Sequence, residues 1–123
     1  MPVKSIRSVP IEPLRLGQGA YRQVLIGPDE GPNFALRRFI IEPGGYLPKH
    51  TNTVEHEQYV LRGKGQIGIG EDVFEVGPGD VVFIPAGVPH WYRCLSDEPF
   101  EFLCVVPNKE DTLQVVEEVS TTC

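Results

Sequence analysis

The sequence predicts an all-β fold, for three reasons. Thirteen glycines and twelve prolines divide the chain into short pieces with strong turn signals between them. The pieces are rich in β-branched and aromatic residues, as strands are. Helical segments of about ten to fifteen residues do not separate them, which argues against a parallel α/β sheet. We therefore expect a sandwich or barrel built from many short strands.

The predicted strands follow one another at short intervals. The first covers residues 21–26 and ends in the turn GPDEGPN, and the second covers 34–42 and ends at Pro43-Gly44-Gly45. The remaining strands are expected at residues 57–61, 65–69, 73–76, 81–84, 90–95 and 100–106. Turns at Glu71-Asp72 and at GPGD (77–80) join three of them. The tail, residues 110–123, fits either a short helix or a strand that pairs with a partner.

Composition limits the partners that we expect. With 123 residues, 41% of them hydrophobic, the chain suits one domain, 1–123, with a packed core. A net charge of −6 and the lack of a basic run argue against nucleic acid as a main partner. No membrane span and no secretory signal is visible, and the three cysteines lack the CxxC spacing, so they are expected as free thiols. These features predict a cytoplasmic protein.

Two stretches contain all three histidines of the chain. Residues 44–63, GGYLPKHTNTVEHEQYVLRG, contain His50 and His56, and residues 79–92, GDVVFIPAGVPHWY, contain His90. No other part of the sequence gathers as much chemistry into as few residues. We expect the two stretches to meet in space and to form one site.

Strand geometry groups the candidate side chains. Residues two apart on a strand point to the same face, so His50 shares a face with Asn52. If His56 faces inward, Gln58 does too, and His90 opens a later strand. Three neutral imidazoles that converge inside an apolar barrel would bind a divalent transition metal.

Simpler roles compete with metal binding at each of these positions. A single histidine is more often a surface or hydrogen-bonded residue than a ligand, but here all three fall where one pattern expects them. Glu55 and Glu57 could be ligands, although exposed carboxylates beside a turn are commoner. Gln58 is better suited to hydrogen bonding in a pocket than to ligation. Cys94 and Cys104 are most simply small core residues.

The histidine stretches resemble the motifs of the cupin family. The first cupin motif has a glycine, five residues, HxH, three or four residues, a glutamate, six residues and a glycine. At these places, with the shorter gap, stand Gly44, His50, His56 and Gly63. The second motif has a glycine, five residues, PxG, two residues, a histidine, three residues and an asparagine. At these places, up to the histidine, stand Gly79, Pro85, Gly87 and His90.

The sequence departs from the family pattern at three positions. Asn52 stands where the second histidine of HxH is usual, and His56 stands at the usual glutamate, as in a four-histidine subgroup of small cupins. Cys94 replaces the asparagine that ends the second motif. The resemblance therefore implies that His50, His56 and His90 bind one divalent transition metal ion (Fe, Mn, Ni, Cu or Zn). Asn52 is a candidate fourth ligand through its amide oxygen, a weak neutral donor, or it could instead hold a metal-bound water.

The resemblance also implies a fold and an assembly. The fold is a single cupin barrel, a double-stranded β-helix or jelly roll, with its motif core at residues 44–94. Small cupins are commonly dimers, and proteins tend to cover open strand edges, so we expect a homodimer.

The expected function is that of a metal-dependent enzyme. A three-histidine centre leaves metal positions open for water, O2 or a chelating substrate, and it resembles the centre of cupin oxygenases that cleave diketone-like molecules. We expect an oxygenase, such as a dioxygenase, or a related isomerase of a small oxygen-rich organic molecule. The alternative is a non-catalytic cupin that binds or senses a small molecule.

Three residues are candidates for substrate binding. Gln58 and Tyr92 are expected on pocket-facing positions of their strands. Arg37 and Arg38 are neighbours on one strand and face opposite ways, so one of them can meet an anionic substrate, and we name Arg38. No residue stands out as a general acid or base, and the catalytic residues are left open.

Overall fold

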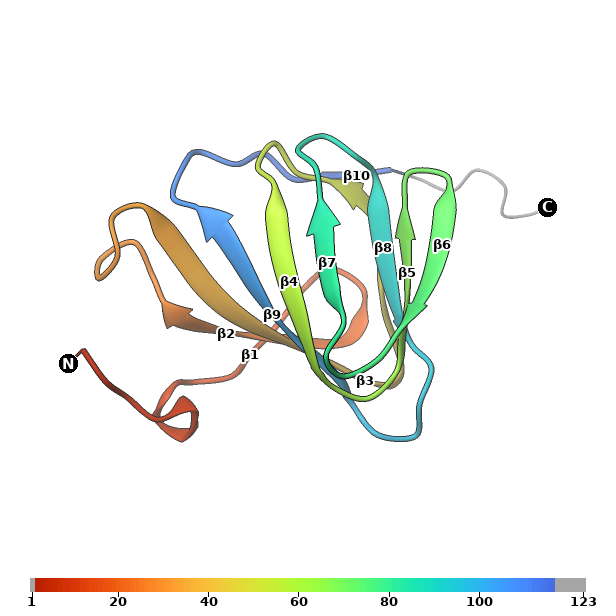
Figure 1. The fold of residues 1–123 in the computed structure, drawn as a ribbon, viewed down its shortest axis with the longest axis horizontal. Helices are drawn as coiled ribbons and strands as arrows, with labels where there is room; N and C mark the ends of the chain where they lie inside the picture. The colour runs from red at the N-terminus through yellow and green to blue at the C-terminus, as the bar shows by residue number, and fades with distance from the viewer. Residues whose placement is uncertain (1, 117–123) are drawn as a thin grey trace.

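The computed structural model describes residues 2–116 and confirms the all-β prediction (Figure 1). One short 3-10 turn, η1 (Ile6–Ser8), precedes the strands. The strands are β1 (Glu12–Pro13), β2 (Gln18–Ile26), β3 (Phe34–Thr51), β4 (His56–Arg62), β5 (Gly65–Ile69), β6 (Asp72–Val76), β7 (Val81–Ile84), β8 (His90–Cys94), β9 (Phe100–Pro107) and β10 (Gln114–Val115). In this part of the chain no helix has the length and apolar character needed to cross a membrane.

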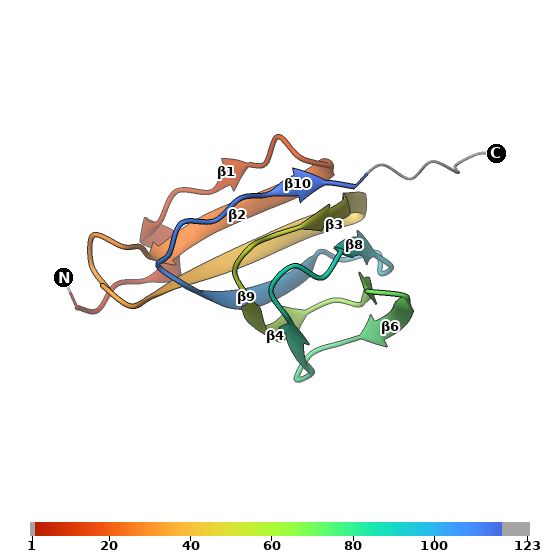
Figure 2. The ribbon, with the colours of Figure 1, turned by 90° about the horizontal axis from the view of Figure 1, so that it is seen from above.

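The strands form one antiparallel sheet that curls on itself. Seven of them are hydrogen-bonded in the order β6-β5-β8-β3-β9-β4-β7. β3 is the centre of the arrangement, because it also pairs with β2 and β10, and β1 pairs with β2. Seen from above, β1, β2 and β10 lie on one side and β4 and β6 on the other (Figure 2). The curl leaves an inner face on which a site can form.

β3 is twice as long as the sequence predicted. The expectation that Pro43-Gly44-Gly45 ends the strand is wrong, because β3 continues to Thr51. Up to Ile41 the strand pairs with β9, and from Tyr46 it pairs with β8. Gly44 has a φ of +83° at this point, a conformation that glycine adopts without steric cost. The tripeptide is therefore a bend at which one strand changes partners.

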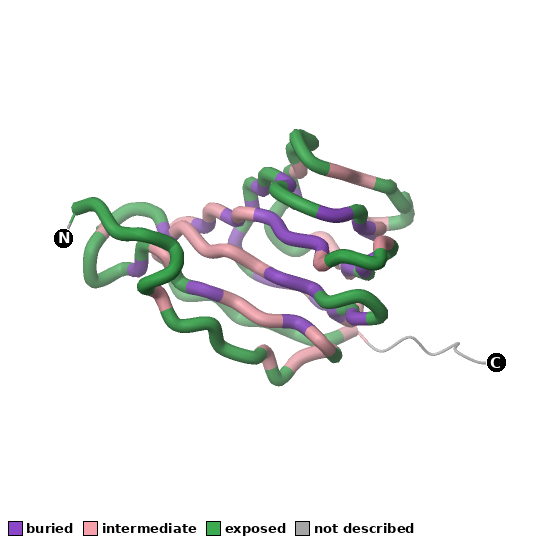
Figure 3. The backbone as a smooth tube through the Cα atoms, turned by 90° about the horizontal axis from the view of Figure 1, so that it is seen from below, coloured by how far each residue is buried: buried purple, intermediate pink, exposed green. Residues whose placement is uncertain are grey.

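Burial alternates along β4 and β8, the strands that begin at His56 and His90, and Figure 3 draws buried backbone in purple. In β4 every second residue from His56 to Val60 is buried, and in β8 every second residue from His90 to Cys94 is buried. This alternation confirms the predicted register of both strands. Aromatic and branched side chains fill the interior around them, and the most enclosed are Phe100, Phe102, Ile41, Ile67 and Ile84.

The segment after β9 returns to the end of β3. Gln114 lies opposite Thr51, and Val115 lies opposite His50 in this antiparallel pairing. Of the two forms expected for the tail, the strand is correct for these two residues. Residues 117–123 lie outside the described part of the chain.

Candidate functional site

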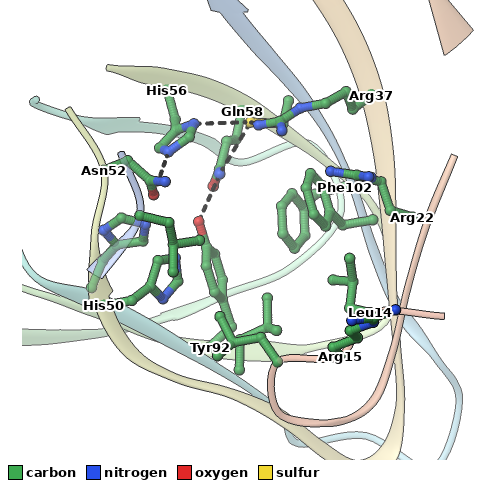
Figure 4. Close-up of a pocket in the computed structure, with 16 residues that line it drawn as sticks. Leu14, Arg15, Arg22, Arg37, His50, Asn52, His56, Gln58, Tyr92 and Phe102 are labelled. Carbon is green, nitrogen blue, oxygen red and sulfur yellow. Dashed lines mark hydrogen bonds between the residues drawn. The ribbon is translucent and has the colours of Figure 1, made fainter. Parts of the chain in front are cut away.

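A cavity of about 270 Å³ opens inside the curled sheet, and all three histidines line it. Figure 4 shows His50, Asn52 and His56 on one side of this cavity and Arg15 and Arg22 on the other. The lining residues are Leu14, Arg15, Leu16, Arg22, Arg37, Phe39, Leu47, His50, Asn52, His56, Gln58, His90, Tyr92, Phe102, Cys104 and Leu113. The structure thus brings together every residue that the sequence proposed for the site except Arg38.

The two histidine stretches meet as expected. His50, near the end of β3, lies directly opposite His90, the first residue of β8, and their ring centroids are 4.3 Å apart. His56 opens β4, and its ring centroid lies 5.4 Å from that of His90. Two imidazoles that share a metal ion, with bonds of about 2.0–2.1 Å, have centroids roughly 4.5–5.5 Å apart. The spacing of His56 and His90 lies within this range, and that of His50 and His90 is slightly shorter, so small ring movements would allow a shared ion.

The backbone holds one ring nitrogen of His50 and one of His90. Nδ1 of His50 lies 2.8 Å from the carbonyl oxygen of Pro48, and Nδ1 of His90 lies 2.9 Å from that of Val88. A carbonyl oxygen only accepts, so each Nδ1 carries the hydrogen and each Nε2 keeps its lone pair. Metal-binding histidines are commonly oriented in this way, by a hydrogen bond from the nitrogen that does not bind the metal.

His56 has different partners. Its Nε2 lies 3.0 Å from Oδ1 of Asn52, and its Nδ1 lies 3.5 Å from Sγ of Cys104. The Asn52 amide is held in turn by Asp111, whose Oδ2 accepts from Nδ2 at 3.0 Å. The same carboxylate accepts from the backbone N–H of Thr53 at 2.8 Å. Asp111 therefore fixes the amide with its oxygen toward His56.

The donor set suits a transition metal, with one adjustment at His56. No three His, Cys, Asp or Glu side chains within residues 2–116 are already arranged to hold a metal ion. Nε2 of His56 is instead hydrogen-bonded to Oδ1 of Asn52. Two neighbouring ligands of an octahedral ion lie about 3 Å apart, which is also the spacing of His56 Nε2 and Asn52 Oδ1, 3.0 Å. The residues fit a metal once His56 carries its hydrogen on Nδ1, beside Cys104.

Burial keeps the three imidazoles neutral. It lowers the pKa of His50 below its usual range and lowers the pKa of His90 to about 4. It also lowers the pKa of His56 to about 3, and there the positive charge of Arg37 adds to the effect. Because only the neutral imidazole binds a metal ion, the site has the required protonation state at neutral pH.

The structure places Arg37, and not Arg38, in the cavity wall. Arg38 lies on the opposite face of β3, where Nε and Nη2 donate to Oε1 of Glu101 at 3.2 and 2.7 Å. Its Nη1 donates to Oε1 of Gln23 at 2.6 Å. The choice of Arg38 as the substrate contact therefore does not agree with its position. The sequence showed that the two arginines alternate, but it did not show which one faces inward.

Gln58 and Tyr92 lie in the cavity as expected, and they contact each other. Nε2 of Gln58 donates to the phenol oxygen of Tyr92 at 2.7 Å. Burial raises the pKa of Tyr92 far above its usual range, so the phenol is neutral. That these two residues bind a substrate remains a prediction.

Sequence reasoning chose Arg38 over Arg37, assigned Cys104 to the core alone, and did not single out Asp111. Cys104 had a signal, because it follows Phe100 and Phe102 at a spacing of two along β9 and shares their buried face. Asp111 had none, because it lies in an irregular segment and its contact with Asn52 spans 59 residues.

Comparison with known proteins gives one family. The family model described as "Cupin domain" matches residues 37–106. The 1-methylthio-D-xylulose 5-phosphate methylsulfurylase of Rhodospirillum rubrum is 35% identical over 97 residues, which are 79% of this chain and 62% of that protein. Acireductone dioxygenase 1 of Pectobacterium atrosepticum is 32% identical over 83 residues, 64% of this chain and 47% of that protein. The chain thus spans about half to three fifths of the length of these relatives.

Solved structures agree with the sequence relatives. The polyketide cyclase RemF of Streptomyces resistomycificus superposes with a TM-score of 0.88 and 31% identity, covering 96% of this chain and 87% of that chain. A cupin-2 domain protein of Rhodospirillum rubrum superposes with a TM-score of 0.85 and 28% identity, covering 97% and 82%. The similarity therefore extends over nearly the whole chain.

Proposed function

The chain belongs to the cupin family, and from this premise we propose that it binds one divalent transition metal ion through His50, His56 and His90. The amide oxygen of Asn52 is the fourth donor of the proposed site. The substrate is a small, oxygen-rich organic molecule held in the adjoining cavity, and the reaction is that of an oxygenase or an isomerase. Because the cupin fold hosts many functions, the proposal rests on the site and not on the fold.

The observation that carries the proposal is the fixed orientation of His50 and His90. Each ring donates Nδ1–H to a backbone carbonyl two residues earlier, at 2.8 and 2.9 Å, and each ring lines the same cavity. The Nε2 atoms of both rings thereby keep lone pairs that are available in the same cavity, and burial keeps both rings neutral. A purely structural role for these histidines would not require both to leave Nε2 without its hydrogen.

The chain also supplies the surroundings that such a reaction needs. A divalent ion bound there would act as a Lewis acid with positions open to a chelating substrate or to O2. Phe39, Leu47 and Phe102 give the cavity an apolar wall that limits water. Gln58 and Arg37 add a polar edge that can orient a substrate. The names of the relatives, a dioxygenase, a methylsulfurylase and a polyketide cyclase, support an activity on small organic molecules.

One observation favours the alternative, a cupin that binds a small molecule without metal. The hydrogen bond from His56 to Asn52, at 3.0 Å, occupies the ring nitrogen that a metal would need. If this bond is permanent, the cavity is a small-molecule pocket with the imidazoles of His50 and His90 in its wall and no metal centre.

Metal analysis separates the two functions. The chain is purified without chelators, its metal content is measured, and the emptied protein is titrated with Fe, Mn, Ni, Cu and Zn. We expect one ion per chain for the wild type and for Arg93→Ala, a change on the same strand as His90 but outside the cavity. His50→Ala and His90→Ala should lose the ion while circular dichroism shows the same fold. A wild-type protein that stays empty with every metal supports the binding module instead.

A further inference from the structure

Two buried polar atoms in the cavity wall have no hydrogen-bond partner among residues 2–116. They are Nε of Arg37, a donor, and Oε1 of Gln58, an acceptor. Both side chains reach the same sulfur, since Arg37 Nη2 and Gln58 Nε2 each lie 3.5 Å from Sγ of Cys104. Buried polar groups in native proteins are nearly always paired. An unpaired donor and an unpaired acceptor on two side chains that converge on Cys104 therefore indicate a place where a ligand binds.

The neighbouring Arg38 shows that a partly buried arginine in this fold can have its guanidinium nitrogens hydrogen-bonded. Three of its nitrogens donate to Glu101 and Gln23 at 2.6–3.2 Å. For Arg37, no carboxylate in the described part of the chain lies within ion-pair distance, and its guanidinium lies 5.0 Å from the ring centroid of Phe39. The positive charge of Arg37 is thus available to an anion.

The Gln58 amide is available to a hydroxyl group. Its side chain is well enclosed, since only 6% of the residue is exposed, and one end of the amide is fixed by Tyr92 at 2.7 Å. A hydroxyl both donates and accepts, so it can pair with the free end in either orientation of the amide. A carboxylate would suit Arg37 but not the free carbonyl oxygen of Gln58.

We propose that the cavity binds a small 2-hydroxycarboxylate with an apolar side chain. The carboxylate accepts hydrogen bonds from Arg37, the hydroxyl on the adjacent carbon pairs with Gln58, and the side chain lies against Phe39 and Phe102. Because the side chains of Arg37 and Gln58 converge on Cys104, one small molecule can reach both, which favours a hydroxyl close to the carboxylate. This inference deepens the proposed function, because it names the substrate class of the same cavity, but the contacts that it uses do not include the metal.

The first test varies the ligand on the wild-type protein. 3-Phenyllactate is compared by calorimetry with 3-phenylpropionate, which lacks the hydroxyl, and with 3-phenyllactamide, which lacks the charge. A hydrogen bond that involves a charged group contributes enough for a loss of ~10-fold or more in affinity. We expect each comparison ligand to bind at least ~5-fold more weakly. Equal affinities, or no binding of 3-phenyllactate at millimolar concentration, would overturn the proposal.

The second test varies the protein. Arg37→Met should weaken 3-phenyllactate binding by ~10-fold or more, and Arg93→Met, a change outside the cavity, should not. Gln58→Leu should abolish the preference for 3-phenyllactate over 3-phenylpropionate. A preference that survives in Gln58→Leu contradicts the assigned hydroxyl contact. The ligand series on the wild type carries the test if Arg37→Met does not fold.

Both tests are made with the chain as purified and again after treatment with a chelator. The proposal predicts the same order of affinities in both states. If the order appears only with metal bound, the metal and not Arg37 with Gln58 selects the ligand, and the inference fails while the metal site stands. If the chain binds no metal but keeps the order, the proposed metal function fails and the inference stands.

Discussion

Nε2 of His56 donates a hydrogen bond to Oδ1 of Asn52 at 3.0 Å, and this contact joins the start of β4 to the residue after β3. Asp111 extends it into the segment before β10, because its carboxylate holds the other end of the Asn52 amide at 3.0 Å. Three distant parts of the chain therefore decide how one ring of the site is presented.

Asp111→Asn should weaken metal binding by ~10-fold, because residues that orient a ligand affect affinity on this scale. Without the carboxylate, the Asn52 amide is free to rotate its oxygen away from His56. Asp80→Asn is the matched control, since Asp80 also accepts a backbone N–H, from Gly77 at 2.8 Å, but lies outside the cavity. Competition titration with a chelator of known affinity measures both. Equal affinities for the two variants would show that Asp111 does not position the site.

Asn52→His should raise metal affinity by ~10-fold or more, or about 1.4 kcal/mol. Imidazole is a better donor than a neutral amide for late transition metals, and residue 52 lines the cavity beside His56. Any reaction that needs the open position should slow. Thr51→His, on the neighbouring residue outside the cavity lining, is the control and should leave the affinity unchanged. A rise in metal affinity in both variants, or in neither, would contradict the role of residue 52 as a metal ligand.

The metal-free protein should lose stability as the pH falls below about 6.5, the value for a histidine in the unfolded chain. The native pKa values of His56 and His90 are about 3 and about 4. Between these values and 6.5 the unfolded chain binds protons that the native chain does not, so the free energy of unfolding falls with falling pH. The slope is on the order of 1 kcal/mol per pH unit for each histidine.

Urea unfolding at several pH values in the presence of a chelator measures this slope. His90→Gln removes one of the three buried imidazoles and should make the slope shallower between pH 6.5 and about 4. A wild-type free energy of unfolding that stays constant over this range would mean that the histidines are not buried as described.

The expected homodimer remains a prediction, and the structure suggests where to test it. Tyr59 lies directly opposite Val81 in the pairing of β4 with β7, and both are exposed, Val81 to 76%. β7 ends the strand order of the sheet, so its outer edge can meet a second copy. Light scattering should show a dimer for the wild type and for Val3→Glu, an equally exposed valine near the N-terminus, and a monomer for Val81→Glu. A monomeric wild type at micromolar concentration would refute the prediction.

Local patterns in the sequence predicted most of the strands and the inward face of β4 and β8. They did so because side-chain direction on a strand repeats every two residues. If His56 faces inward, Gln58 does too, and if His90 faces inward, Tyr92 does too. The extent of β3 was mispredicted, because Pro43-Gly44-Gly45 has the composition of a turn but forms a bend between two partner strands.

Contacts between distant residues could not be predicted in this way. Which of Arg37 and Arg38 faces the cavity depends on the pairing of β3 with β9, where Arg37 lies opposite Cys104. The hydrogen bond of Asp111 to Asn52 depends on the path of an irregular segment. The sequence therefore indicated the three histidines, Asn52, Gln58 and Tyr92, but the choice of Arg37 and the orientation of His56 required the structure.

The central claim is that one metal ion binds the Nε2 atoms of His50, His56 and His90. Anomalous scattering from crystals grown with the metal that the chain retains, recorded on both sides of that metal's absorption edge, tests it most directly. The account predicts one anomalous peak about 2.1 Å from all three Nε2 atoms, with the hydrogen bond between His56 and Asn52 broken. An empty cavity in which His56 Nε2 still lies 3.0 Å from Asn52 Oδ1, or a metal bound elsewhere, would contradict it.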